Sequence, residues 1–174
     1  QNQNDITPNI NQNFVEEKIS REDSIAQTDR IVIENDKVIG SISLRGAVFD
    51  DLSFKNYKQS LATTDQVVLL NPKETEEGYF IETGWTSVGN KIKVPGLDTQ
   101  WTVKGNKFLN KNTPVILEWN NNEGLIFQKK ILLDDSYLFK IEQNVRNNTS
   151  RPIDLFPYSQ ITRNKKPDDI MEFY

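Results

Sequence analysis

The chain has 174 residues, of which 36% are hydrophobic, and a formal net charge of −4. This length suits a single domain with a real core, and the acidic balance disfavours nucleic-acid binding, which needs a basic surface. The chain contains no His and no Cys, which excludes zinc sites of the usual ligands and Ser–His or Cys–His nucleophiles. The aliphatic runs are far shorter than the roughly 20 residues that a membrane-spanning helix needs.

The first 27 residues are predicted to form a disordered polar linker. Residues 1–13 are rich in Asn and Gln and have little apolar surface. Residues 14–27 mix charged side chains with isolated apolar ones, which favours at most a transient helical turn. Such a composition buries too little apolar surface to offset the entropy of ordering the chain. A tether before a folded domain implies attachment to something upstream of Gln1.

From Thr28 onward the sequence alternates with a period of two, which is typical of strands. Residues 30–34 and 38–44 are predicted to pair through a turn at Asn35-Asp36. In the second strand, Val38 and Ile42 share one face, whereas Ser41 and Ser43 share the other. Further strands are predicted at residues 47–54, 67–70, 79–85, 91–94, 99–104, 114–119 and 153–162, the last broken by Pro157.

The clearest hairpin joins residues 125–133 to residues 137–147 through Asp134-Asp135-Ser136. In its second arm Phe139 and Ile141 alternate with charged residues, as in an antiparallel sheet with one face exposed to solvent. Regularly spaced strands without a long helical pattern predict an all-β antiparallel sandwich over residues 28–174.

Acidic doublets occur at residues 50–51, 134–135 and 168–169. Glycosidases need two carboxylates that flank a sugar, but adjacent residues on a strand point to opposite faces. The doublet at Asp134-Asp135 is interpreted as turn chemistry, and no calcium-binding loop is present. We therefore predict no catalytic residue, no metal ligand and no cofactor site.

Three tryptophans offer the best candidates for a ligand site, because indole rings stack on sugars. Trp119 alternates with apolar residues and is predicted to lie in the core. Trp85 follows a glycine and Trp101 follows a glutamine, so these two are the candidates for an exposed ligand groove. A carbohydrate-binding or glycan-processing β-sandwich is therefore the alternative function. Several lysines near Pro95-Gly96 are interpreted as a solvated face, since Asp98 is interspersed among them.

Several strand segments resemble the opening of the large periplasmic domain of YidC-type bacterial membrane protein insertases. The resemblance lies in Thr28–Ile33, in Gly40–Ala47 (GSISLRGA) and in Asp50–Tyr57 (DDLSFKNY), with weaker similarity in later blocks up to Arg163.

The resemblance implies a β-supersandwich related in shape to mutarotase-like domains, of which this chain forms the N-terminal portion. It also implies a membrane-embedded parent protein whose first transmembrane helix precedes the polar linker, with the domain on the periplasmic side of the inner membrane. The expected function is non-enzymatic: a scaffold or docking module for Sec translocon components and nascent membrane proteins. Mutarotase chemistry depends on His, which this chain lacks, and fold alone does not fix function.

Overall fold

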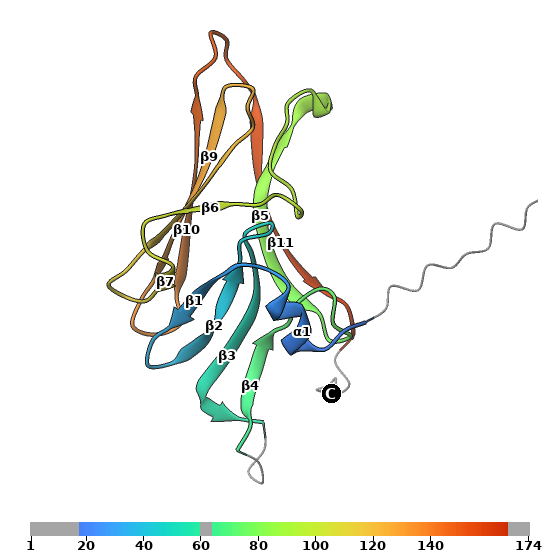
Figure 1. The fold of residues 1–174 in the computed structure, drawn as a ribbon, viewed down its shortest axis with the longest axis vertical. Coiled ribbons are helices and arrows are strands. Elements are labelled where there is room, and N and C mark those ends of the chain that lie inside the picture. The colour runs from blue at the N-terminus through green and yellow to red at the C-terminus, as the bar shows by residue number, and fades with distance from the viewer. Residues whose placement is uncertain (1–17, 60–63, 167–174) are drawn as a thin grey trace, which may run out of the picture.

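Alternating apolar residues place two β-sheets face to face in the computed structural model, which describes residues 18–59 and 64–166 (Figure 1). The helical segments are α1 (Arg21–Ala26) and the short 3₁₀ turn η1 (Val88–Asn90). The strands are β1 (Arg30–Glu34), β2 (Val38–Ser43), β3 (Val48–Lys58), β4 (Gln66–Leu70), β5 (Tyr79–Ser87), β6 (Thr102–Lys104), β7 (Phe108–Leu109), β8 (Val115–Asn120), β9 (Leu125–Leu133), β10 (Phe139–Asn147) and β11 (Leu155–Arg163).

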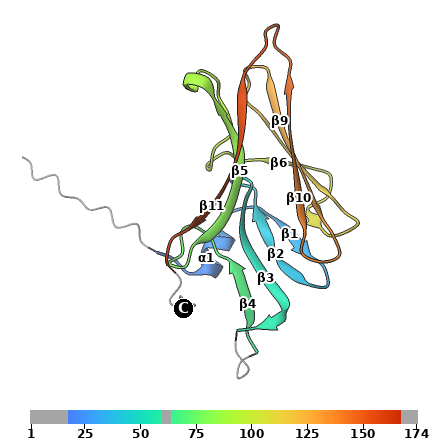
Figure 2. The same cartoon turned by 180° about the vertical axis from the view of Figure 1, so that it is seen from behind.

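The larger sheet has seven strands in the order β11-β5-β3-β2-β1-β7, with β4 paired to β3 beside β5. The smaller sheet has the order β10-β9-β8-β6. All pairs between these strands are antiparallel except β1 with β7. The predicted all-β antiparallel sandwich is therefore confirmed. After β10 of the smaller sheet, a loop returns the chain to the larger sheet at β11 (Figure 2).

The core lies between the two sheets, where the inward-facing residues of β9 are buried at every second position. Phe127 of β9 packs edge-on against Trp85 of β5, with ring centroids 5.1 Å apart. It also contacts Trp119 of β8, which is half-buried. Aromatic residues from three strands thus join the sheets, as burial of large apolar side chains is the main stabilising contribution to such a fold.

Period-two alternation predicts the β9–β10 hairpin and β1 closely, but two other strands differ from expectation. Residues 91–94 form no strand; they follow η1, in which Gly89 has a positive φ of 64°. Pro157 does not break the last strand, because β11 lies at the edge of its sheet, where a missing N–H is tolerated. The two-residue strand β7 is too short to give a periodic signal.

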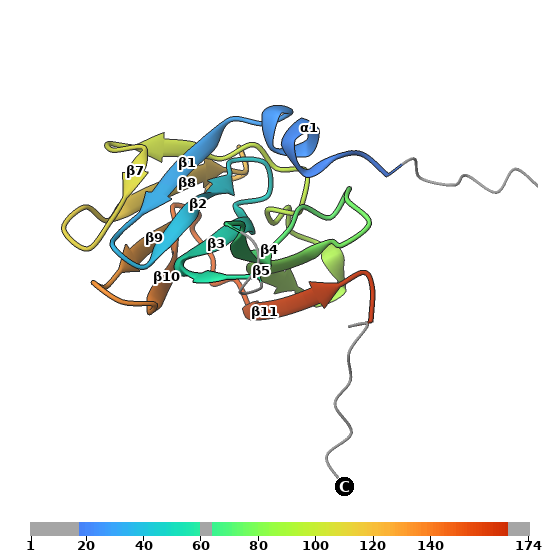
Figure 3. The same ribbon diagram turned by 90° about the horizontal axis from the view of Figure 1, so that it is seen from below.

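The last residues of the predicted linker carry a short helix, whereas residues 1–17 lie outside the described part of the chain. Helix α1 begins after Ser20, whose side chain accepts a hydrogen bond from the Asp23 backbone N–H as an N-cap. The helix lies beside β1 to β4 and away from the β9–β10 hairpin (Figures 1 and 3). Ordered structure therefore extends upstream of residue 28.

Helix α1 explains why β2 and β3 are buried on both faces. Ser41, Ser43, Asp51 and Ser53 are buried, although sequence alternation assigns them to the face away from the core. Alternation would place Asp50 on the opposite face from Asp51, but the pairing of β2 with β3 shifts register at this point, and Asp50 is buried as well. Two glycines shape the same region. A Cβ on Gly40 would lie 2.1 Å from the carbonyl oxygen of Asp51, and Gly46 turns the chain with a positive φ of 77°.

Candidate functional site

Trp85 and Trp101, the candidates for an exposed ligand groove, are both buried. Their exposed fractions are 5% and 2%, so the expected exposure is wrong. Trp85 packs on Phe127, and the ring of Trp101 lies 5.0 Å from the ammonium nitrogen of Lys129. Neither indole offers an open face on which a sugar ring could stack.

Lys129 is the most unusual residue near these tryptophans, because it occupies an inward position of β9 and is only 2% exposed. Its Nζ donates a hydrogen bond of 2.6 Å to the carbonyl oxygen of Thr83 in the opposite sheet. Burial lowers the pKa of this ammonium group to about 8, although nearby Glu82 opposes the shift. The hydrogen bond and the cation–π contact give the charge two partners, so it ties the sheets together.

Glu82 and Tyr158 lie beside Lys129 around a cavity of ≈ 10 Å³. Burial raises the pKa of the Tyr158 hydroxyl, and the Glu82 carboxylate adds to the shift. The cavity is of the size that holds about one water molecule, which is too small for a sugar or a cofactor. Glu82, Lys129 and Tyr158 thus form a polar cluster that links β5, β9 and β11 inside the sandwich.

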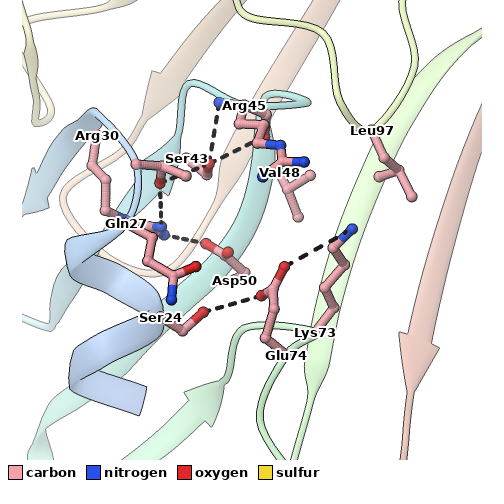
Figure 4. A pocket seen from close by; sticks show the side chains of 11 residues that line it. Ser24, Gln27, Arg30, Ser43, Arg45, Val48, Asp50, Lys73, Glu74 and Leu97 are labelled. Carbon is pink, nitrogen blue, oxygen red and sulfur yellow. Dashed lines mark hydrogen bonds and ion pairs between the residues drawn. The ribbon is translucent and has the colours of Figure 1, made fainter. Parts of the chain in front are cut away.

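The acidic doublet Asp50-Asp51 forms a second buried polar cluster, on the outer face of the larger sheet. Figure 4 shows Asp50 with its surroundings. Arg30 of β1 forms an ion pair with Asp50, and Arg21 of α1 forms one with Asp51. The hydroxyl of Ser41 donates a 2.5 Å hydrogen bond to Asp51. Each carboxylate thus has its own arginine, and no second carboxylate faces it across an open sugar-sized cleft.

Burial raises the pKa of the Asp50 carboxyl to about 6, and the attraction of Arg30 only partly opposes the effect. A cavity of ≈ 30 Å³ lies beside it under α1, lined by Ser24, Gln27 and Glu74 among others (Figure 4). In residues 18–59 and 64–166, no group of three or more acidic side chains has a geometry that could hold a metal ion. The doublet holds the N-terminal segment in place.

The doublet at Asp134-Asp135 acts as predicted for a turn. Asp134 Oδ1 accepts hydrogen bonds from the backbone N–H groups of Ser136 (2.8 Å) and Leu138 (2.9 Å). This bonding fixes the connection between β9 and β10. The third doublet, Asp168-Asp169, lies outside the described residues.

A large apolar groove lies between the sheets, where β3, β4 and β5 face β10. It comprises two adjoining hollows of ≈ 350 and ≈ 360 Å³ that share Phe54 and Tyr137. The residues that line it, which define the apolar groove, are Val38, Phe49, Leu52, Phe54, Tyr57, Val67, Leu69, Leu70, Ile81, Tyr137, Phe139 and Ile141.

The groove opens beside strand edges that pair with no further strand among residues 18–59 and 64–166. β10 ends the smaller sheet and β11 ends the larger one. Tyr57 is 56% exposed at the groove, and the neighbouring Leu138 is 67% exposed. A contiguous apolar hollow next to free backbone N–H and C=O groups is typical of a surface that binds another segment of polypeptide.

Sequence reasoning did not identify this groove, because its residues come from five strands and the turn before β10. The feature of the sequence that relates to the groove is the apolar face of residues 137–145, which alternation assigns to the core. Phe139, Ile141 and Val145 are only half-buried, since nothing in the described chain covers β10 from its outer side.

Comparison with known proteins gives a consistent result. Residues 30–174 match the family model described as the YidC periplasmic domain. A protein named "Membrane protein insertase YidC" from Pelagibacter ubique is 42% identical over 171 residues, covering 98% of this chain and 30% of that protein. Proteins of the same name from Allorhizobium ampelinum and Rhizobium meliloti are 42% and 38% identical, each covering 85% of this chain.

The chain spans less than a third of the length of each of these relatives. Within residues 18–59 and 64–166, none of the helices has the length and apolar character needed to cross a membrane. The matched region includes both the Gly40–Ala47 segment and the acidic doublet that binds Arg21 and Arg30. The two-sheet fold, the match over residues 30–174 and the relatives together show that this chain belongs to the YidC periplasmic domain family.

Proposed function

We propose that this chain is the N-terminal part of the periplasmic domain of a membrane protein insertase and that it works there as a non-enzymatic docking module. Its partners would be Sec translocon components and nascent membrane proteins, on the periplasmic side of the bacterial inner membrane. The family match and the relatives' name support the insertase setting. The residue inventory supports a binding role, because the chain has neither His nor Cys.

The apolar groove is the observation that carries the proposal. Its two hollows expose far more apolar than polar surface, and they lie beside the unpaired edge of β10. An extended or partly folded segment gains backbone hydrogen bonds at such an edge and buries its apolar side chains in the hollow. Catalysis on a small polar substrate requires polar side chains and charges that converge on the substrate. The apolar groove is instead lined by apolar and aromatic residues.

Site-specific photo-crosslinking in a full-length insertase that carries this domain tests the proposal. A photoreactive residue at Tyr57, in the groove, is expected to capture a translocon subunit or a nascent membrane protein. The same probe at Lys107, an exposed position outside the groove, serves as the control and is expected to capture neither. Crosslinks from Tyr57 only to other parts of the insertase itself would show that the groove is filled from within, and would overturn its docking role.

A further inference from the structure

Helix α1 is held on the larger sheet by polar contacts. Arg21 pairs with Asp51, the Ser24 hydroxyl donates a 3.0 Å hydrogen bond to Glu74, and the Ile19 backbone N–H donates to the Glu74 carbonyl oxygen at 3.3 Å. Ser24 is the buried residue of the helix. No large apolar side chain of α1 is fully buried against the sheet, so the docking lacks a strong hydrophobic contribution.

A helix of six residues is marginal in water by itself, because nucleation costs more than a single turn returns. The helical state of α1 therefore depends on its contacts with the sheet. Undocking and unwinding of α1 should occur together, while the sheets stay intact beneath it.

The docked helix also helps to keep Asp50 away from water. Ser24 of α1 and its C-cap residue Gln27 line the cavity beside the Asp50 carboxyl group. The charged groups that act on Asp50 come from three elements: Arg30 of β1 attracts it, whereas Asp51 of β3 and Glu74 of the β4–β5 loop repel it. Arg45 and Lys73 line the same cavity.

We propose that α1 is a proton-sensitive clasp, which docks more firmly on the sheet when Asp50 takes up a proton and loosens when Asp50 is ionised. When α1 undocks, water reaches the Asp50 carboxyl group. Hydration stabilises the ionised form of this group more than the protonated form, so ionisation favours undocking. The clasp is a property of this chain and does not depend on which partner the domain binds.

The direction of the pH effect on α1 docking follows from the linkage between proton binding to Asp50 and docking. Burial raises the pKa of Asp50 to about 6 from 3.8 in the folded chain, and hydration in the undocked state returns it toward its ordinary value. Between those two values the docked state binds more protons than the undocked state. A fall in pH through this window therefore favours docking, and a rise above pH 6 removes that contribution.

Hydrogen exchange of the α1 amides tests the clasp in the 174-residue chain. Exchange measured at pH 5.0 and pH 7.5, and corrected for the intrinsic rates, should show greater protection of α1 at pH 5.0, by up to about tenfold. Amides of β9 should keep their protection at both pH values. Equal protection of α1 at the two pH values, or greater protection at pH 7.5, would overturn the proposal.

Two substitutions with the same charge change sharpen this result. Asp50→Asn resembles the protonated carboxyl, so α1 should be protected to a similar degree at both pH values. Asp154→Asn is the matched control, because Asp154 is exposed in the loop between β10 and β11 and does not line this cavity, and it should keep the wild-type difference. Retention of the pH difference in Asp50→Asn would assign it to another group and refute the clasp.

A carboxyl titration followed by NMR gives an answer without altering Asp50. Its midpoint should lie near pH 6 in the wild-type chain. It should fall in Arg21→Gln, which removes the ion pair between α1 and Asp51 and so favours undocking. Equal midpoints in an Arg21→Gln variant whose α1 amides have lost protection would show that α1 does not control the hydration of Asp50.

Discussion

At Lys129 a charged side chain occupies a position that the alternation of β9 assigns to an apolar residue. Its neighbours on the same face, Phe127 and Ile131, are both fully buried. A buried charge is costly unless it is paired and hydrogen-bonded, and here the Thr83 carbonyl oxygen and the Trp101 ring supply the partners. The charge is therefore tolerated, and its burial sets a pH dependence.

Stability should rise with pH between pH 8 and pH 9.5 because of Lys129. Its folded pKa of about 8 lies below the ordinary value of 10.5, so the unfolded chain binds more protons in this window. The expected gain is about 1 to 2 kcal/mol, measured by urea denaturation. Lys129→Met should abolish the gain, whereas Lys130→Met, on the other face of β9, should retain it. A gain that persists in Lys129→Met would mean that another group causes it.

Depth in the sandwich decides the cost of truncating an aromatic side chain. Phe127 is fully buried between Trp85 and Trp119, whereas Phe139 is half-buried and has one edge-on aromatic contact, with Phe49. Phe127→Ala should cost about 3 to 5 kcal/mol as a core cavity, and Phe139→Ala about 1 to 2 kcal/mol. Equal losses in denaturant titrations of the two variants would contradict the assignment of the β10 face to an open groove.

Among the elements, α1 shows what periodicity cannot predict. Alternation predicts β1 and the β9–β10 hairpin because their buried faces repeat every two residues within one segment. The docking of α1 depends instead on Arg21 and Asp51, which are 30 positions apart. Composition suggested a linker, since α1 has few apolar residues, but polar partners on the sheet compensate for them. The second face of β2 was likewise predicted to carry Ser41 and Ser43, and both serines are buried.

Removal of α1 should therefore destabilise the domain. A chain of residues 28–174 leaves Asp51 and Glu74 without Arg21 and Ser24. Relative to a chain of residues 18–174, the expected loss is about 1 to 2 kcal/mol, smaller than for a fully buried pair because water replaces the lost partners. Thermal or urea unfolding of the two chains measures the difference. Identical curves would support the linker interpretation for residues 18–27.

For the molecule as a whole, the two sheets close well on one side and leave an apolar groove on the other. The β8–β9 side buries most of its inward residues, with Val115, Leu117 and Ile131 fully buried. On the β10 side, Tyr137 and Leu138 remain exposed. The family resemblance implies that this chain forms the N-terminal portion of a β-supersandwich, and one portion of a sandwich is expected to leave apolar surface uncovered. The location of the groove required the three-dimensional arrangement of β3, β4, β5 and β10.

The exposed groove should bind an apolar-surface dye, because contiguous apolar patches of this kind are uncommon on isolated monomers. Tyr57→Ser should reduce the dye fluorescence of the 174-residue chain, since Tyr57 lines the groove. Phe156→Ser is the matched control: Phe156 is as exposed as Tyr57, 56% in each case, but lies on β11 outside the groove. It should leave most of the signal unchanged. Equal reductions from both substitutions would show that the dye reports scattered apolar side chains, and a dye-silent wild-type chain would show that the groove is closed in solution.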